Sequence, residues 1–311
     1  MLCLALAVHL PQASSPPVAA DTIRIVDDLG RTLTFPAPAT RIVSLIPAAT
    51  EILFELGAGD QVVGRTQYGT HPPEAIDVPD VGEGIRPSAE VVLARSPDAV
   101  VLFAGPDNEA SVAEFERLGI PTLALYHNSF RDLERNIERL GALSGHSIEA
   151  AEAVTRIRAQ LAEVAALTRE VTPVSVYYDL WANPPITIGA GSYLDSLLRV
   201  AGGSNVFGDL PEPSPQVSLE AIVVRDPALI IVPVESGTIR VTPADRQGWA
   251  VVPAVREDRV RNVEADLLHR LGPRIGDAAV ALALAIHPEL SARLAPLRDA
   301  ADSATEPRMD R

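Results

Sequence analysis

The chain has 311 residues, of which 47% are hydrophobic, and a formal net charge of −15. That length suits two domains, and the hydrophobic content can build a core, which excludes a disordered chain. All 26 basic residues are arginines and they form no run, so the basic patch of a nucleic-acid or anionic-membrane binder is missing. Cys3 is the single cysteine, which excludes a disulfide within the chain.

The first twenty residues have the composition of a secretory signal. An apolar run over residues 2–10 is followed by a segment rich in Pro, Ser and Ala that ends in small residues. We therefore predict a signal peptide over residues 1–20, cleaved after Ala20, and an extracytoplasmic protein. The usual basic opening is missing, so we expect the true start upstream. A buried first strand is the alternative. A lipid anchor on Cys3 is not expected, because Leu2 rather than a small residue precedes it.

From residue 41 onward, short β-rich runs alternate with helical segments. In the first half the pattern predicts strands at 42–46, 61–64, 99–103 and 122–125, and helices at 49–56, 88–95, 108–118 and 131–143. In the second half it predicts strands at 174–178, 229–232 and 260–263, and helices at 192–201, 218–225 and 274–286. Such alternation is typical of parallel sheets covered by helices.

Residues 147–168 interrupt this alternation with one long amphipathic helix. Apolar residues recur there at helical spacing, at Ile148, Ala151, Val154, Ile157, Leu161 and Val164. At 1.5 Å per residue the helix would be roughly 33 Å long, about the width of a small domain. It lies midway between the two alternating halves, so we expect a stiff strut rather than a flexible linker.

The two halves also resemble each other. The segment SAEVVLARSPDAVV (88–101) aligns without a gap to SLEAIVVRDPALII (218–231), and EILFELGAGDQVVG (51–64) aligns to DSLLRVAGGSNVFG (195–208). The matches come in the same order, which indicates two related lobes; convergence of common α/β patterns is the alternative. Two lobes joined by a rigid element leave a cleft between them, and ligand sites favour such interfaces.

Motifs for nucleotide or acyl chemistry are missing from the sequence. It has no GxGxxG after a strand, no GxSxG, and no lysine at all, which excludes a P-loop. His71, His127 and His269 lie far apart without metal-ligand spacing. We therefore predict that the chain is not an enzyme and holds no metal site.

Several segments resemble the cobalamin and iron-complex periplasmic binding proteins of ABC importers, and most closely the members that bind vitamin B12. These segments include DDLGRTLTFPAPA (27–39), RIVSLIPAATEILFELGAGDQVVG (41–64), YGTHPP (68–73), NPPITIGAGSYLDSLLRVAGG (183–203), PQVSLEAIV (215–223) and GPR (272–274). The resemblance spans residues 24–290. It implies a class III periplasmic binding protein, with an α/β fold of two Rossmann-like lobes with parallel sheets bridged by a single long α-helix.

Combined with the pattern of elements, the resemblance gives the expected domain boundaries. They are a signal peptide at 1–20, an N-terminal lobe at 21–145, an interlobe helix at 146–170, a C-terminal lobe at 171–295 and a polar tail at 296–311. The implied partners are the importer's membrane permease and, through it, its ATPase subunits. The chain would be a monomer that carries a small molecule and has no cofactor of its own.

The resemblance also carries functional residues over to this chain. Glu109 and Glu220 match the glutamates on the tips of the two lobes, which pair with arginines of the permease. A carboxylate at the start of a helix is also favoured by the helix dipole, so a structural role is the alternative for both. Asp266 and Arg270 match a polar pair that contacts the corrin ligand, although their spacing equally permits a plain helical salt bridge.

The aromatic residues of the corrin-binding cleft are carried over less completely. Tyr68 matches a tyrosine, and Phe103 stands where the relatives have a tryptophan. Leu180, Ser214 and Leu267 replace aromatic residues, and Trp181 is expected to supply some of the lost surface. The expected ligand is a cobamide, meaning cobalamin or its precursor cobinamide.

Haem and a ferric siderophore are the alternative ligands. Tyr68, His71, His127 or His269 could supply an axial iron ligand. An anionic siderophore would need several cleft arginines, for which the candidates are Arg65, Arg86, Arg240 and Arg270.

Overall fold

The computed structural model describes residues 22–235, 237 and 241–305, with side chains described as far as Arg298. The predicted signal peptide, with Cys3, and the siderophore candidate Arg240 lie outside these residues. Within them, no single helix is long and apolar enough to cross a membrane. Two consecutive segments, Ile275–Ile286 and Pro288–Arg298, are together long and apolar enough by length and composition, but they are bent sharply against each other.

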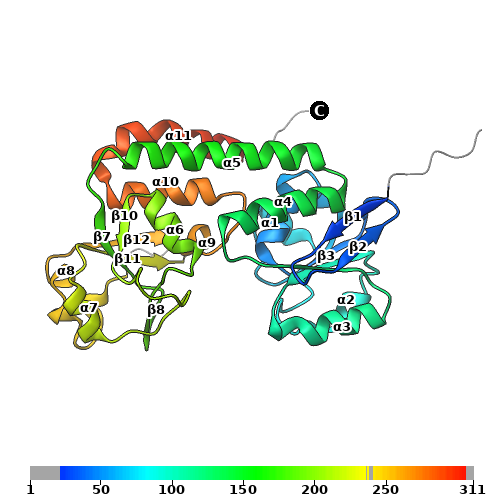
Figure 1. Cartoon of the computed structure of the whole chain (residues 1–311), viewed down its shortest axis with the longest axis horizontal. Helices are drawn as coiled ribbons and strands as arrows, with labels where there is room; N and C mark the ends of the chain where they lie inside the picture. Colours follow the sequence, from blue (N-terminus) through cyan, green and yellow to red (C-terminus); the bar gives the residue numbers. More distant parts are fainter. Residues whose placement is uncertain (1–21, 236, 238–240, 306–311) are drawn as a thin grey trace, which may run out of the picture.

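Two four-stranded parallel sheets form the centres of two lobes (Figure 1). The N-terminal lobe has the order β4-β3-β5-β6, built from β3 (Ile42–Ser44), β4 (Val62–Arg65), β5 (Ala99–Phe103) and β6 (Thr122–Leu125). The C-terminal lobe has the order β10-β7-β11-β12, built from β7 (Val174–Tyr178), β10 (Gly203–Asn205), β11 (Leu229–Val234) and β12 (Val260–Glu264). The two orders correspond strand by strand, so the predicted fold class is confirmed.

Helices cover both sheets, and two antiparallel hairpins lie beside them. The N-terminal lobe has α1 (Pro47–Glu55), α2 (Ala89–Leu93), α3 (Glu109–Arg117), α4 (Phe130–Ser144) and the hairpin of β1 (Ile23–Val26) and β2 (Thr32–Phe35). The C-terminal lobe has α6 (Tyr193–Val200), α7 (Leu219–Arg225), α8 (Pro253–Arg256), α9 (Ala265–Leu268), α10 (Ile275–Ile286) and the hairpin of β8 (Trp181–Ala182) and β9 (Pro185–Ile186). The last helix, α11 (Ser291–Thr305), packs along α5 and α10.

Helix α5 (Ser147–Thr168) runs along one side of both lobes, at the top of Figure 1. It contacts α4 in the N-terminal lobe and α6 and α10 in the C-terminal lobe. Its buried face includes Ala150, Ala153, Val154, Ile157 and Val164. Those contacts fix the helix against both lobes along its length, as expected for a strut.

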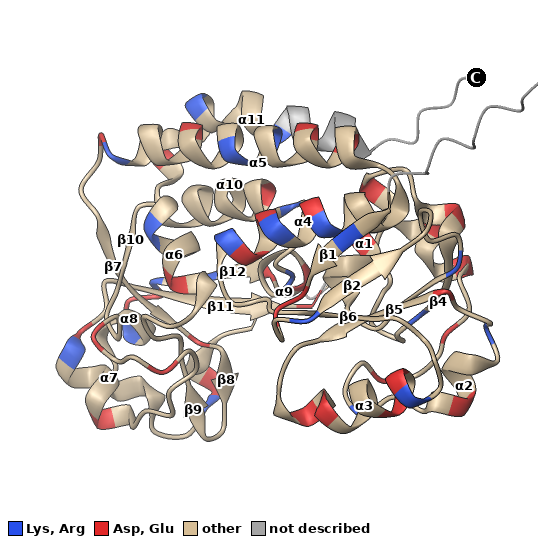
Figure 2. Cartoon of the chain, turned by 45° about the vertical axis from the view of Figure 1, so that its right-hand side comes forward, with Lys and Arg blue, Asp and Glu red and all other residues tan. Residues whose placement is uncertain are grey.

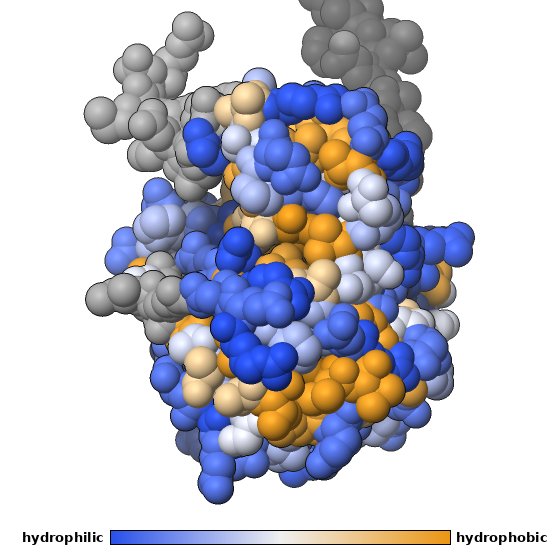
Figure 3. Space-filling model, turned by 90° about the vertical axis from the view of Figure 1, so that its left-hand side faces the viewer, coloured by the Kyte–Doolittle hydropathy of each residue, from blue (hydrophilic) through white to orange (hydrophobic). Residues whose placement is uncertain are grey.

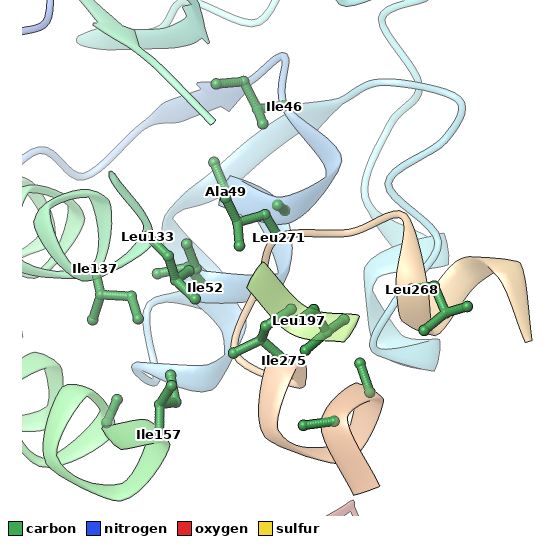
Figure 4. Close-up of a cluster of buried hydrophobic side chains, with 14 of the residues drawn as sticks. Ile46, Ala49, Ile52, Leu133, Ile137, Ile157, Leu197, Leu268, Leu271 and Ile275 are labelled. Atoms are coloured by element: carbon green, nitrogen blue, oxygen red, sulfur yellow. The ribbon is translucent and has the colours of Figure 1, made fainter. Parts of the chain in front are cut away.

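One continuous apolar core joins the two lobes. It contains Ile46, just before α1, Ala49 and Ile52 of α1, Ile157 of α5, and Leu268, Leu271 and Ile275 of the C-terminal lobe (Figure 4). Where the lobes meet, the backbone of Gly272 is so close to α1 that a Cβ there would lie 3.8 Å from the Cβ of Ala48. Separating the lobes would therefore expose apolar surface to water, which resists a wide opening.

Three local features differ from the sequence pattern. Strand β10 was not predicted, because Gly, Ser and Asn all have low β propensity. The alignment of residues 51–64 with 195–208 places Val62, the first residue of β4, opposite Val206. The corresponding strand of the C-terminal lobe, β10, already ends at Asn205, so the two strands are offset in this alignment. Helix α11 extends to Thr305, so part of the expected polar tail is helical.

The crossing of α4 and α5 depends on Gly141. A Cβ at this position would lie 2.5 Å from the Cβ of Ala150 and 2.9 Å from the carbonyl oxygen of His146. Gly141→Ala should therefore push the helices apart and lower the free energy of unfolding by about 1–3 kcal/mol, despite the better helix propensity of alanine. Guanidinium unfolding measures this loss. Glu138→Ala, at an exposed position of the same helix, is the control and should change stability by less than about 0.5 kcal/mol. Equal stability of Gly141→Ala and the wild type would contradict the close contact.

Candidate functional site

A cavity of about 900 Å³ lies between the lobes, beyond the carboxyl ends of the parallel strands. The N-terminal lobe contributes residues at the end of a strand or after it, for all four strands: Ile46, Pro47, Ala48, Tyr68, Thr70, Phe103 and His127. The C-terminal lobe contributes Tyr193, Glu235, Glu264, Ala265, Asp266, His269, Arg270 and Leu271. Ligands of open parallel α/β sheets bind at this edge of the strands. The interlobe cleft is therefore the candidate site.

A second cavity, of about 860 Å³, lies beside the edge strand β10 and the end of α5. Among the described residues, Phe130 is the only one from the N-terminal lobe that lines it, and none of the predicted ligand-binding residues does. Because it is not formed at strand ends of both lobes, it does not compete with the interlobe cleft as a site for a ligand held between the lobes.

Four of the five predicted ligand-binding residues line the cleft: Tyr68, Phe103, Asp266 and Arg270. The fifth, Trp181, does not line it. Trp181 lies in the β8–β9 hairpin, 62% exposed, with its indole N–H donating to the carbonyl of Asn183 at 3.2 Å.

An ion network crosses between the lobes beneath the cleft. Arg274, just before α10, makes two hydrogen bonds to Glu51 of α1, at 2.8 and 3.1 Å. The same guanidinium donates to Asp266 at 3.1 Å, and Asp266 also pairs with Arg270 at 2.5 Å. Arg270 in turn donates to the hydroxyl of Thr70 in the opposite lobe at 3.2 Å. Asp266 and Arg270 thus form an ion pair at four-residue spacing, although Arg270 lies two residues beyond the end of α9, and both residues line the cleft.

Sequence reasoning missed Glu51 and Arg274. Glu51 is 3% exposed on the buried face of α1, among alanine, isoleucine and leucine. A carboxylate on an otherwise apolar helix face requires a partner, because an unpaired buried charge is costly. That pattern was the available signal, but it could not identify a partner 223 residues away.

His127 lines the cleft beside Phe103, with ring centroids 5.8 Å apart in an edge-to-face arrangement. Its Nδ1 lies 3.1 Å from the side-chain amide nitrogen of Asn136 on α4. Its Nε2 is buried and has no hydrogen-bond partner among the described residues. Burial lowers the pKa of His127 to about 4, against the opposing effects of the Tyr126 carbonyl, Asp132 and Asp28, so the ring is neutral at pH 7.

His269 lines the cleft and meets Tyr178, which is buried behind the cavity lining. Its Nε2 lies 3.0 Å from the hydroxyl of Tyr178. Burial lowers the pKa of His269 and raises that of Tyr178 well above its usual range, so neither group is charged at neutral pH. The charges among the described lining residues are therefore three carboxylates, Glu235, Glu264 and Asp266, and one guanidinium, Arg270. This lining is net negative.

Most of the other candidates for haem or siderophore binding lie away from the cavity. Arg65 is buried and donates to three backbone carbonyls, those of Thr66, Ala75 and Ile76. Arg86 is exposed and pairs with Asp107. His71 does not line the cavity; burial lowers its pKa, and Glu51 acts in the opposite direction. Within the described part of the chain, no three His, Cys, Asp or Glu side chains are grouped to hold a metal ion.

The two predicted docking glutamates are exposed and lie outside the cleft. Glu109 is the first residue of α3 and Glu220 the second of α7. Both helices lie on the side of the lobes opposite α5, and Figure 2 marks acidic residues on each of them in red. Glu90 has the same setting as Glu220, since each follows by two residues a serine that caps its helix, Ser88 or Ser218.

The environment of His127 predicts a pH dependence of stability. The pKa of its imidazole is about 4 in the folded chain and 6.5 without the protein's influence. Between these values the unfolded state binds more protons, so stability falls as the pH drops from about 6.5 to about 4, by about 3 kcal/mol in all. Above pH 6.5 the contribution vanishes.

Comparison with His127→Phe isolates this effect, because nearby carboxylates titrate in both proteins. Urea unfolding at several pH values between 7.5 and 4.5 should show the wild type losing more stability on acidification than the variant. Parallel stability curves would show that His127 binds its proton equally well in the folded and unfolded states.

Known proteins with similar sequences and structures are named for binding small molecules. The vitamin B12-binding protein of Vibrio cholerae serotype O1 is 30% identical over 250 residues, which cover 79% of this chain and 88% of that protein. The crystal structure of the periplasmic vitamin B12-binding protein BtuF of Vibrio cholerae has a TM-score of 0.69 at 28% identity, covering 80% of this chain and 97% of that one.

A heme-binding protein and a substrate-binding lipoprotein of an ABC transporter are also similar to this chain. The apo periplasmic heme-binding protein RhuT from Roseiflexus sp. RS-1 has a TM-score of 0.71 at 27% identity, covering 80% of this chain and 98% of that one. An uncharacterized ABC transporter substrate-binding lipoprotein of Bacillus subtilis, YvrC, is 28% identical over 274 residues, 86% of each chain. Residues 42–267 match the periplasmic binding protein family. The chain therefore belongs to the periplasmic binding proteins, the extracytoplasmic substrate-binding components of ABC importers.

Proposed function

We propose that this chain binds a cobamide, either cobalamin or cobinamide, in the interlobe cleft and delivers it to the membrane permease of an ABC importer. The observation that carries the proposal is the composition of the cleft: a net negative lining with neutral imidazoles and aromatic rings, formed by both lobes. The similarity to vitamin B12-binding proteins supports the same conclusion.

Charge separates the candidate ligands. A corrinoid carries uncharged amide side chains around a broad apolar plate, so aromatic faces and neutral hydrogen-bonding groups suit it. A siderophore with several anionic groups would be repelled by Glu235, Glu264 and Asp266, with Arg270 as the one attractive guanidinium among the described lining residues. The cleft therefore favours a neutral or cationic ligand over an anionic one.

Haem is the second candidate, because Tyr68 lines the cavity with 56% of its surface exposed. A phenolate oxygen can serve as an axial iron ligand. Of the other ligands considered for iron, the Nε2 of His269 already meets Tyr178, and His71 lies outside the cavity lining. The similarity to a heme-binding protein favours this candidate, whereas the negative lining opposes the carboxylates of haem.

A transport role also accounts for the groups outside the cleft. Glu109 and Glu220, one on each lobe, would pair with arginines of a two-subunit permease through charge-assisted hydrogen bonds. Val224, one turn after Glu220 on α7, is 83% exposed, and Figure 3 shows an apolar patch on this end of the C-terminal lobe. A carboxylate beside exposed apolar surface is suited to contact with another protein.

An enzyme with the same architecture is the alternative from a different class. It would need an acid, a base and a nucleophile that converge on the cavity. The described histidines of the cleft wall, His127 and His269, are neutral, but neither is hydrogen-bonded to a serine or a cysteine. Turnover of a ligand by the isolated protein would favour this alternative over transport.

Binding assays on the chain without its predicted signal peptide test the ligand assignment. Calorimetric titration with cyanocobalamin and dicyanocobinamide should give dissociation constants in the micromolar range or below. Arg270→Gln should weaken that binding about ten- to a hundredfold, as expected for loss of a charged hydrogen-bond donor. Arg86→Gln, which removes an exposed arginine outside the cleft, should leave affinity unchanged. Binding of hemin alone would sink the cobamide assignment and direct attention to Tyr68→Phe.

Charge reversal at the tips tests delivery. Glu109→Arg and Glu220→Arg should abolish uptake of labelled cyanocobalamin by cells that depend on this chain, with affinity in solution changed less than twofold. Glu90→Arg, the same charge change at the position that corresponds to Glu220 in the other lobe, is the control and should preserve uptake. Loss of affinity in the tip variants would place these glutamates in ligand binding instead. Loss of uptake in the control would show a general charge effect.

A further inference from the structure

The described part of the cleft wall holds two buried nitrogens without a partner, Nε2 of His127 and one terminal guanidinium nitrogen of Arg270. A buried polar group without a hydrogen bond is costly, and most such groups in native proteins are paired. The ring borders the cavity and is held on both sides, by the edge of Phe103 and by Asn136. The His127 ring is therefore a fixed part of the wall.

Asn136 determines which nitrogen of His127 carries the proton. Its buried side-chain amide nitrogen donates to the carbonyl of Tyr126 at 2.7 Å and faces Nδ1 of His127 at 3.1 Å. The two hydrogens of this amide can serve both acceptors. Reversing the amide would place its oxygen 2.7 Å from the Tyr126 carbonyl, with two acceptors facing each other. Nδ1 is thus the acceptor, so the single proton of the neutral ring is on Nε2.

We propose that His127 determines specificity as a hydrogen-bond donor to the transported ligand and is not a metal ligand. Its Nε2–H, oriented by Asn136, takes an oxygen acceptor of the ligand, either an amide carbonyl or a carboxylate. A metal ligand would need the lone pair of Nε2, which this tautomer does not have. The inference rests on the proposed function in that it assigns a role within the same cleft.

The charge state of the ring supports this role. Because the pKa of His127 is about 4, the ring stays neutral at the pH where the ligand binds. A neutral donor in a net negative cleft adds a hydrogen bond without attracting anions. A neutral donor suits the amide groups at the rim of a corrinoid better than the carboxylates of haem. Titration with corrinoids and with hemin distinguishes these two sources of the acceptor oxygen.

Nitrogen NMR of the ligand-free chain tests the tautomer without reference to any ligand. In protein labelled with ¹⁵N-histidine at pH 7, the signals missing from His127→Phe identify His127. We expect a protonated Nε2 and an unprotonated Nδ1. A protonated Nδ1 would overturn the proposal, because Nε2 would then be free to bind a metal. Asn136→Leu should weaken the preference between the two tautomers.

Ligand titration tests the donor role. His127→Phe keeps an aromatic ring against Phe103 but removes the N–H, so affinity for cyanocobalamin or dicyanocobinamide should fall about five- to tenfold. His146→Phe, at the junction of α4 and α5 outside the cavity lining, is the matched control and should bind as the wild type does. Unchanged affinity in His127→Phe would refute a hydrogen bond to the ligand.

Hemin provides the third comparison. If hemin binds, we expect the position of its Soret band to be the same in the wild type and in His127→Phe, with weaker binding in the variant. A shifted band would identify His127 as an axial ligand and overturn the proposal. If the wild type binds neither cyanocobalamin, dicyanocobinamide nor hemin, the proposed function is wrong. The tautomer of His127 is measured by NMR without any ligand, so that result would not be affected.

Discussion

The ion pair between the buried Glu51 and the partly buried Arg274 is the constraint on which the cleft depends. It joins α1 of one lobe to the start of α10 in the other, within an apolar core that both lobes share. Opening the lobes widely would expose that core and separate two charges in a region of low polarity, and both changes are costly. Because Arg274 also holds Asp266, the polar groups of the cleft are attached to the interface that resists opening.

The polarity of the sheets explains why the site forms where it does. Parallel strands place all their carboxyl ends at one edge, and in each lobe that edge faces the partner lobe. The strands at 99–103, 122–125 and 174–178 could be predicted to the residue, because short apolar runs that contain Val, Thr, Phe or Tyr favour strands. Strand β10 could not be predicted, because Gly203, Ser204 and Asn205 have no strong β propensity. They form a strand because the fold places them beside β7.

The site was less predictable than the fold. Tyr68, Phe103, Asp266 and Arg270 came from resemblance to a family, and no physical argument from the sequence placed them together. Glu51 and Arg274, or Tyr178 and His269, meet only after folding, across separations of 223 and 91 residues. Spacing along a chain carries no information about such pairs. Nearness in the sequence can also mislead. Trp181 is next to Leu180, which replaces an aromatic residue of the relatives, yet the Trp181 ring is exposed and does not line the cavity.

The protonation states of the cleft connect its structure to ligand choice. Burial keeps His127 and His269 neutral, so near neutral pH the charge of the described lining is set by its carboxylates and Arg270. A site of this kind selects against anions by repulsion and selects among neutral molecules by hydrogen-bond geometry. Asn136 belongs to the same selection although it does not line the cavity, because it decides whether His127 presents a proton or a lone pair. The class of ligand that this cleft binds therefore depends on Asn136, which contacts a lining residue without lining the cavity itself.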